Sequence, residues 1–307
     1  MDHLIPIDKN LPDFLFVPGE NGGTYPFSHS LLVKANEKEA VLFDSGFGHT
    51  GVRKVLNEFK ITKVFLTHWH EDHISGNYLL RKKKAEFYCH PLDARLLRDI
   101  GQFQTFYYTV GSSVEDYFQE ILLSMKLENL SEIQEVKDGE EIKIGNSSTI
   151  EVIHTPGHSA GHCCYYEPFL RLIFLADIDL SGLGPWYGCL DSNLEDYMKS
   201  INRLIQMDIE YAISSHKGIY SGKKEIRSQL SKFLNVIDLR DNKILEELSE
   251  GKPKSIEDLI GKGIIYRNYD QIREYLFIAE KQMILKHIIR LEKRGVISES
   301  ENKFILN

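Results

Sequence analysis

The stretch Thr67-His68-Trp69-His70-Glu71-Asp72-His73 places three imidazoles and a carboxylate at the offsets His-x-His-x-Asp-His. It follows a β-rich run directly and leads into a helical pattern, so it joins the end of a strand to a helix. His68 and His70 lie two apart on an extended backbone and can point the same way, whereas Asp72 and His73 lie past the turn. If His68 and His70 bind one ion, Asp72 and His73 can reach a second ion about 3.5 to 4 Å away, which is the usual spacing of a two-metal site. The sequence therefore predicts a site for two divalent metal ions.

The donor set also indicates which metal to expect. Neutral imidazoles combined with a hard carboxylate suit Zn²⁺, and they suit iron or manganese less selectively. We therefore expect two zinc ions, with Fe or Mn as alternatives.

The chain resembles the metallo-β-lactamase superfamily, whose signature is Thr-His-x-His-x-Asp-His. Four further segments match other motifs of that family in the family's order, one before the signature and three after it: Phe43-Asp44-Ser45-Gly46, Thr155-Pro156-Gly157-His158, Leu175-Ala176-Asp177 and Ser215-His216-Lys217-Gly218. The resemblance covers about residues 10 to 220. It implies an α/β fold, a four-layer αβ/βα sandwich.

The resemblance also implies a role for each ligand. One metal would be held by His68, His70 and His158, the other by Asp72, His73 and His216, and Asp177 would bridge both. Lys217 stands where the family usually has Gly after the last histidine, and Ala176 stands where Gly is common before the bridging aspartate.

Four further residues have expected positions near the ligands. Asp179 competes with Asp177 for the bridging role, but Asp177 directly follows an apolar run and is preferred. Asp44 is implied to orient a liganding imidazole through its other ring nitrogen, with a turn or cap role as the alternative. The remaining histidines fit no ligand position, and His162 and His49 are the two most suited to support the ligands from outside.

The implied chemistry is hydrolysis. A water shared by two cations loses a proton near neutral pH, and the resulting hydroxide is the nucleophile. Asp177 would hold the two ions together and Asp72 could return a proton to the leaving group. The expected substrate is a small-molecule thioester or lactone, as in relatives that hydrolyse hydroxyacylglutathione or quorum-sensing lactones.

The candidate substrate contacts are aromatic. They are Tyr25, in a Gly-rich loop, and Trp186 and Tyr187, just beyond the bridging aspartate. Tyr187 could donate a hydrogen bond to an oxyanion. The aromatic insert at residues 103–108 is a further candidate, and core packing explains it equally well.

Two domains are expected. Residues 1–222 form the catalytic domain, with strands at 14–17, 30–34, 40–43, 63–67, 85–89, 149–154, 163–167, 170–175 and 211–215 and helices at 52–59, 74–81, 91–99, 114–127 and 194–205. Residues 223–307 form a small helical domain: a helix over 223–248, a capped short helix from Ser255, a long helix over about 271–293 and a terminal hairpin. That order resembles a winged helix.

The net charge of −8 is uneven. Residues 223–307 carry 17 Lys and Arg against 14 Asp and Glu, a charge of +3, which leaves −11 for residues 1–222. The acidic part argues against nonspecific binding of nucleic acid by that domain. A basic stripe on the long helix nevertheless keeps a lactamase-like endoribonuclease as an alternative: Lys281, Lys286, Arg290, Lys293 and Arg294.

A second alternative is a metal-bearing ligand sensor whose tail binds DNA. The tail could instead cover the active-site mouth or support a homodimer. No apolar stretch is long enough to span a bilayer, no secretory signal is visible, and the four cysteines form no Cys-x-x-Cys pair. We therefore expect a soluble cytoplasmic protein with reduced thiols.

Overall fold

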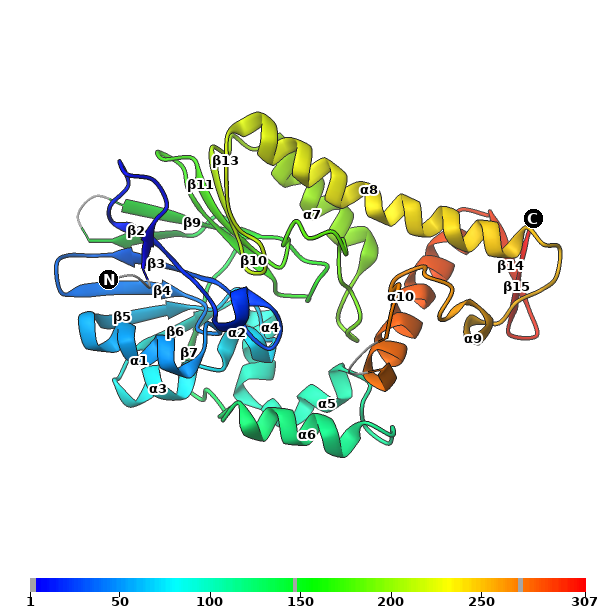
Figure 1. The fold of residues 1–307 in the computed structure, drawn as a ribbon, viewed down its shortest axis with the longest axis horizontal. Helices are drawn as coiled ribbons and strands as arrows, with labels where there is room; N and C mark the ends of the chain where they lie inside the picture. Colours follow the sequence, from blue (N-terminus) through cyan, green and yellow to red (C-terminus); the bar gives the residue numbers. More distant parts are fainter. Residues whose placement is uncertain (1–3, 146–147, 270–272) are drawn as a thin grey trace.

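The computed structural model describes residues 4–145, 148–269 and 273–307. Within these ranges the chain forms two facing β-sheets with helices on their outer sides (Figure 1). This is the α/β layered sandwich expected from the sequence. The expected long helix begins at Gln271, which lies outside the described residues, as does His3.

The first sheet is seven-stranded and takes its strands in chain order. Its members are β1 (Ile5–Pro6), β2 (Phe14–Val17), β3 (Ser30–Lys34), β4 (Glu39–Phe43), β5 (Lys60–Phe65), β6 (Glu86–Cys89) and β7 (Ile133–Glu135). Strands β1 to β4 pair antiparallel, whereas β4 to β7 pair parallel. The parallel strands therefore end at one edge, where the motif that follows β5 lies.

The second sheet is six-stranded, in the order β13-β12-β11-β10-β9-β8. Its members are β8 (Glu141–Ile144), β9 (Ser148–His154), β10 (Cys163–Glu167), β11 (Leu172–Ala176), β12 (Tyr211–Ser214) and β13 (Gly218–Ser221). Its pairs are antiparallel except for β11 with β12. Because β11 and β12 are parallel, the residues that follow them meet at the same edge.

Neighbouring side chains of a strand contribute to two separate layers of the hydrophobic core. In β3, Leu31 and Val33 join the apolar cluster between the two sheets, together with Phe174 and Ile213 of the second sheet. Leu32 points the other way, into the cluster beneath the outer helices of the first sheet. Side chains of a strand alternate between faces, so one sequence run serves both layers.

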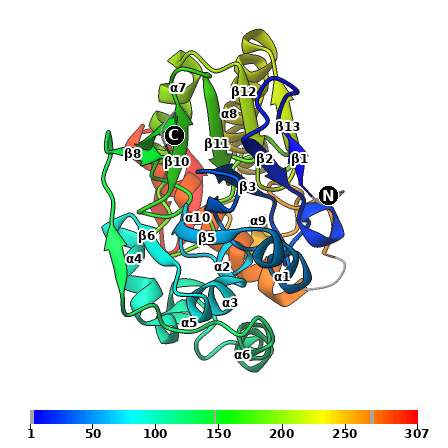
Figure 2. The same ribbon diagram turned by 90° about the vertical axis from the view of Figure 1, so that its left-hand side faces the viewer.

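Helices cover the outer faces of both sheets (Figures 1 and 2). The first sheet has α1 (His49–Glu58), α2 (Glu71–Ile74), α3 (Asn77–Lys82) and α4 (Pro91–Arg98), followed by η2 (Ile100–Gln102), α5 (Phe103–Phe106) and α6 (Glu115–Ser124). A short η1 (Glu20–Gly23) precedes β3, and α7 (Leu194–Gln206) packs on the second sheet.

The helix expected over 74–81 is in fact two helices, α2 and α3, so that prediction was wrong in detail. The break falls at Ser75-Gly76. The chain packs so closely there that a Cβ on Gly76 would lie 2.5 Å from the carbonyl oxygen of Ser45.

The C-terminal elements follow the expected order. They are α8 (Lys223–Leu248), α9 (Ile256–Leu259), α10 (Arg273–Lys293) and an antiparallel hairpin of β14 (Ile297–Ser300) and β15 (Lys303–Leu306). Ser255 and Asp258 form a capping box at the start of α9. The winged-helix resemblance and the boundary at residue 222 stay predictions.

The C-terminal segment shares a core with the second sheet. Ile237 and Ile244 of α8 and Ile284 of α10 belong to the same buried cluster as Ile173 of β11 and Ile201 of α7. Figure 1 shows α8 running from the sheets to the far end of the molecule, while α10 begins beside α5 and runs back to the β14–β15 hairpin at that far end. Among the described residues, none of the helices combines the length and apolar character that crossing a bilayer requires.

The shared core predicts a large stability loss from a single truncation in α8. Ile237 is fully buried, so Ile237→Ala removes buried methylenes and leaves a cavity. We expect urea unfolding to show that the free energy of unfolding falls by about 2 to 5 kcal/mol. Leu239→Ala on the same helix, where the side chain is 51% exposed, is the control and should cost less than about 1 kcal/mol. Equal losses from the two variants would contradict a shared core.

Candidate metal centre

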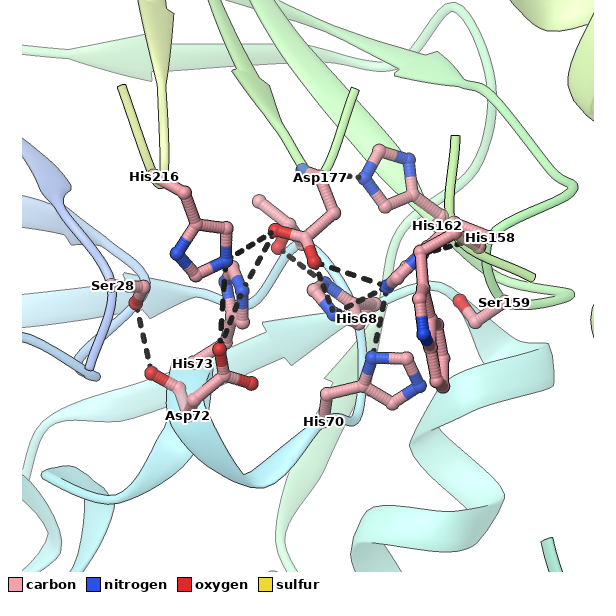
Figure 3. A network of polar contacts seen from close by, with 12 residues as sticks. Ser28, His68, His70, Asp72, His73, His158, Ser159, His162, Asp177 and His216 are labelled. Carbon is pink, nitrogen blue, oxygen red and sulfur yellow. Dashed lines mark hydrogen bonds and ion pairs between the residues drawn. The ribbon is translucent and has the colours of Figure 1, made fainter. Parts of the chain in front are cut away.

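The predicted ligands meet at the edge where the strands of both sheets end (Figure 3). His68 follows β5 and His158 follows β9. Asp177 follows β11, and His216 follows its parallel neighbour β12. The parallel pairing therefore brings together residues that are far apart in the sequence.

The first ligand group contains His68, His70, His158 and Asp177. The Nε2 atom of His158 lies 3.2 Å from Nε2 of His68 and 2.9 Å from Nδ1 of His70. One carboxylate oxygen of Asp177, Oδ2, lies 3.2 Å from the same His158 nitrogen. Three imidazole nitrogens and one carboxylate oxygen thus converge on a single point, as the resemblance implied.

The second group contains Asp72, His73 and His216. The Nε2 atoms of His73 and His216 lie 3.7 and 3.6 Å from Oδ2 of Asp72. The other oxygen of Asp177, Oδ1, lies 2.9 Å from His73 and 3.4 Å from His216. Asp177 therefore presents one oxygen to each group.

Asp179 lies outside both groups. Its Oδ1 accepts a hydrogen bond from the backbone N–H of Ser181, although the residue does line the adjacent cavity. Asp177, by contrast, directs one oxygen at each group.

Asp44 orients two of the liganding imidazoles, His73 by a direct hydrogen bond and His68 through the hydroxyl of Thr67. Its Oδ2 accepts hydrogen bonds from Nδ1 of His73 at 2.8 Å and from the hydroxyl of Thr67 at 2.7 Å. The Thr67 hydroxyl, having donated to Asp44, can accept from Nδ1 of His68 at 2.9 Å. Each Nδ1 then carries the proton, which leaves Nε2 free to bind a metal.

Backbone carbonyls orient two further rings. Nδ1 of His158 lies 2.9 Å from the carbonyl oxygen of Trp186, and Nδ1 of His216 lies 2.6 Å from that of Gly23. A carbonyl only accepts, so Nδ1 of each ring carries a proton and Nε2 is the nitrogen that faces the ligand groups. The ring of His70 has the opposite orientation. Its Nδ1 faces the ligand group, and its Nε2 lies 3.4 Å from the sulfur of Cys189.

The two supporting histidines have different surroundings. His162 is fully buried, and its Nε2 accepts from the backbone N–H of Asp177. It therefore supports the ligands from outside. His49 instead contacts the carbonyl oxygen of Ser75 and the ring of Tyr78.

Glycine is required where the motif turns. A Cβ on Gly46 would lie 1.5 Å from the carbonyl oxygen of Asp72, so only glycine lets the Asp44-Ser45-Gly46 turn approach the ligand segment. Ser28 completes this contact by donating its hydroxyl to the same carbonyl at 2.8 Å.

The charge of the site favours cations. Burial lowers the pKa of His73, but the carboxylates of Asp177, Asp72 and Asp44 outweigh it and raise that pKa well above its usual value. Burial is likewise outweighed at His216, where Asp177 and Asp72 raise the pKa to about 9. Without a metal, the carboxylates therefore hold positive charge on these two rings.

Two buried polar atoms also fit a metal. Nε2 of His73 and Oδ1 of Asp177 are shielded from solvent, and among the described residues neither makes a well-formed hydrogen bond, although the two atoms lie 2.9 Å apart. Leaving such atoms unsatisfied is costly. A cation between them would satisfy both, so the donor set fits the metals that the sequence predicts.

A cavity of about 350 Å³ opens beside the two groups. It is lined by Asp72, His70, His158, Asp177 and His216 from the ligand set, and by Tyr25 and Trp186 from the predicted substrate contacts. Glu71 also lines it and accepts from the hydroxyls of Tyr25 and Tyr107, at 2.9 and 2.5 Å. Burial, with the neighbouring Asp72 charge, raises the pKa of Glu71 to about 7.

Tyr187 does not line this cavity. It is fully buried, and its hydroxyl lies 2.6 Å from Nε2 of His287 and 2.8 Å from the guanidinium of Arg240. Successive residues of an extended segment point to opposite sides, so Trp186 reaches the cavity and Tyr187 does not. The candidate oxyanion donor is therefore a packing residue.

The aromatic insert divides in the same way. Tyr107 lines the cavity, whereas Phe103 is fully buried against Trp69. The core-packing interpretation thus holds for Phe103, and substrate contact by Tyr107 stays a prediction.

Arg240 is a positioning residue that the sequence reading missed. It is 2% exposed, and its guanidinium donates to the carbonyl oxygens of Leu183 and Pro185 at 2.7 and 2.6 Å. Those bonds hold the loop whose Trp186 carbonyl orients His158. The available signal was a charged residue on the apolar stripe formed by Ile237 and Ile244.

The basic stripe of α10 is largely engaged in internal contacts. Lys281 pairs with Glu257, and Lys286 donates to the carbonyl oxygen of Cys189. Arg290 is 3% exposed and bonds Asp241. The stripe therefore gives little support to the endoribonuclease alternative.

The family model described as the metallo-beta-lactamase superfamily matches residues 23–216. The chain belongs to this superfamily. A metallo-β-lactamase family protein of Thermus thermophilus superposes with a TM-score of 0.73 at 17% identity, over 97% of this chain and all of that one. The superfamily fold thus extends through the described C-terminal segment in at least one solved structure.

Two curated hydrolases are similar to parts of this superfamily member. A hydroxyacylglutathione hydrolase of Rhizobium etli is 30% identical over 119 residues, 39% of this chain and 34% of that protein. An atrochrysone carboxyl ACP thioesterase of Passalora fulva is 24% identical over 228 residues, 69% of this chain and 56% of that protein. Both names describe hydrolysis of thioesters, which supports a metal-dependent hydrolase in general.

Asp44 should control metal affinity without binding metal. Asp44→Asn keeps the size of the side chain but weakens its bond with His73, and we expect metal affinity to fall about 10- to 100-fold. Competition with a chromophoric chelator measures the change. Asp208→Asn, at a surface carboxylate paired with Lys223, is the control. Unchanged affinity in Asp44→Asn would contradict the orienting role.

Metal affinity should rise with pH. In the metal-free protein the pKa of His216 is about 9, so at about pH 7 the ring is protonated and must lose its proton when a cation binds. Each displaced proton gives about a tenfold gain in apparent affinity per pH unit below that pKa. Chelator competition between about pH 6.5 and 9 measures it, and a pH-independent affinity would contradict the raised pKa.

Proposed function

We propose that the protein is a binuclear metal-dependent hydrolase that cleaves the ester-like bond of a small-molecule thioester or lactone. The observation that carries this proposal is the position of Asp177, whose two oxygens face two separate groups of ligands beside an accessible cavity. Such an arrangement serves hydrolysis when two cations are bound.

The proposed assignment follows the two groups. His68, His70 and His158 would hold one ion, Asp72, His73 and His216 the other, and Asp177 both. Zinc is the proposed metal, because imidazoles predominate in the ligand set as a whole, with five histidines and two aspartates. Bound divalent cations would polarise the carbonyl of the substrate and lower the pKa of a water.

The protein's own residues would orient the reactants and move the proton. The rings of His68, His73, His158 and His216 are held by bonds to their outer nitrogens, so the ligand positions are fixed before substrate arrives. Asp72 lines the cavity, and burial raises the pKa of its carboxyl group. It is therefore suited to carry a proton to the leaving group.

Similarity to two thioester hydrolases favours a thioester over a phosphodiester. The pairing of Lys and Arg side chains on α10 with other residues also disfavours RNA as the substrate, because RNA binding depends on cations that can neutralise phosphates. A DNA-binding or dimer-forming role of the tail stays a prediction.

A parallel panel of substrates tests the proposal. The metal-loaded protein is assayed on a thioester, a lactone, a phosphodiester and single-stranded RNA, with His70→Ala as the blank and Phe277→Ala, at an exposed site on α10, as the control. We expect thioester or lactone hydrolysis that falls at least about 100-fold in His70→Ala and after chelation of the metal. RNA cleavage without turnover of either small ester would reverse the proposal.

A further inference from the structure

The cavity beside the ligands has a largely aromatic wall. Two of its rings come from the C-terminal segment, and the others come from separate parts of the catalytic region. The aromatic members are Tyr25, Tyr107, Trp186, Tyr266 and Tyr275, and they are joined by Leu183 and Leu276. An assembly from such distant segments is a built feature of the fold.

The polar ends of four of these rings, those of Tyr25, Tyr107, Trp186 and Tyr266, are already bonded to one another or to Glu71. The hydroxyls of Tyr25 and Tyr107 both donate to Glu71. The indole N–H of Trp186 donates to the hydroxyl of Tyr266 at 2.8 Å. With these groups satisfied, the rings present mainly carbon to the cavity.

Tyr275 is held by ring contacts. Its centroid lies 6.1 Å from that of Tyr107 and 6.0 Å from that of Phe118. This packing connects α10 to the insert at residues 103–108 and closes the aromatic wall. The C-terminal segment is therefore part of the substrate cavity.

The cavity offers little to a polyanion. Of its lining residues in the described part of the chain, Lys217 is the only Lys or Arg, and the acidic members are Glu71, Asp72, Asp177 and Asp179. A substrate with several carboxylates or phosphates normally meets several Arg or Lys side chains. An apolar group meets no such requirement and gains from leaving water.

We propose that the substrate carries a bulky, uncharged acyl group, aromatic or alkyl, that lies against the rings of Trp186 and Tyr275. This inference rests on the proposed function, since the acyl carbonyl must reach the metal ligands. A volume of about 350 Å³ accommodates a group much larger than acetyl. Each added methylene that is buried should raise kcat/KM by about fourfold, which corresponds to about 0.8 kcal/mol.

The test is a series of thioesters on one neutral thiol, N-acetylcysteamine, hydrolysed by the zinc-loaded full chain. The acyl groups are acetyl, butyryl, hexanoyl, 2-naphthoyl and the ω-carboxylated analogue of hexanoyl. We expect kcat/KM to rise at least about 50-fold from acetyl to hexanoyl or naphthoyl. The ω-carboxylated analogue should have a kcat/KM at least about tenfold lower than that of hexanoyl.

Variants on α10 locate the effect. Tyr275→Ala should reduce the ratio of kcat/KM for naphthoyl to kcat/KM for acetyl at least about tenfold. Tyr275→Phe should retain the preference, because the ring face is kept. Phe277→Ala, whose side chain is 43% exposed on the same helix, is the matched control and should behave like the parent protein.

The outcomes separate this inference from the proposed function. Metal-dependent hydrolysis with equal kcat/KM for all acyl groups would leave the function standing and overturn the inference. Absence of any thioester hydrolysis would contradict thioesters as substrates. In that case 2-naphthoic acid should still raise the thermal midpoint of the zinc-loaded protein, and equimolar acetic acid should not. An equal effect of both acids, or none, would overturn the inference.

Discussion

The structure depends on burying one carboxylate, Asp177, between two groups of imidazoles. An ionised carboxylate is costly to remove from water unless positive charge compensates it. Here burial raises the pKa of Asp177, but His73, His216 and His158 outweigh it and hold that pKa well below its usual value. The same negative charge makes the site attractive to cations. The two sheets and their parallel strand pairs act together to place these residues at one edge.

The C-terminal segment contributes to this arrangement from outside the matched family region. Arg240 holds the loop whose Trp186 carbonyl orients His158, and Tyr266 and Tyr275 close the cavity. The network that includes Arg240 and Tyr187 is buried and fully internal. One continuous chain of contacts thus joins the C-terminal helices to the ligand groups, which explains why the sheet and these helices share a core.

The features that were predicted well from the sequence are those that depend on the spacing of residues within a short segment. The ligand motif lies at fixed offsets after a strand, and the long helix α8 was expected with the bounds that it has, because its apolar spacing is regular. The short strands β1, β7, β8 and β13 were missed, because a few residues give little periodicity. Trp186 and Tyr187 were equal candidates until packing placed them on opposite sides. Tyr275 could not be foreseen, since its position results from contacts between segments far apart in the chain.

The most direct test of the central claim is anomalous X-ray scattering from crystals of the zinc-loaded protein. The account predicts two peaks about 3.5 to 4 Å apart, one beside each ligand group, with a different oxygen of Asp177 directed at each. A single peak, or two peaks of which neither lies within bonding distance of Asp177, would contradict it.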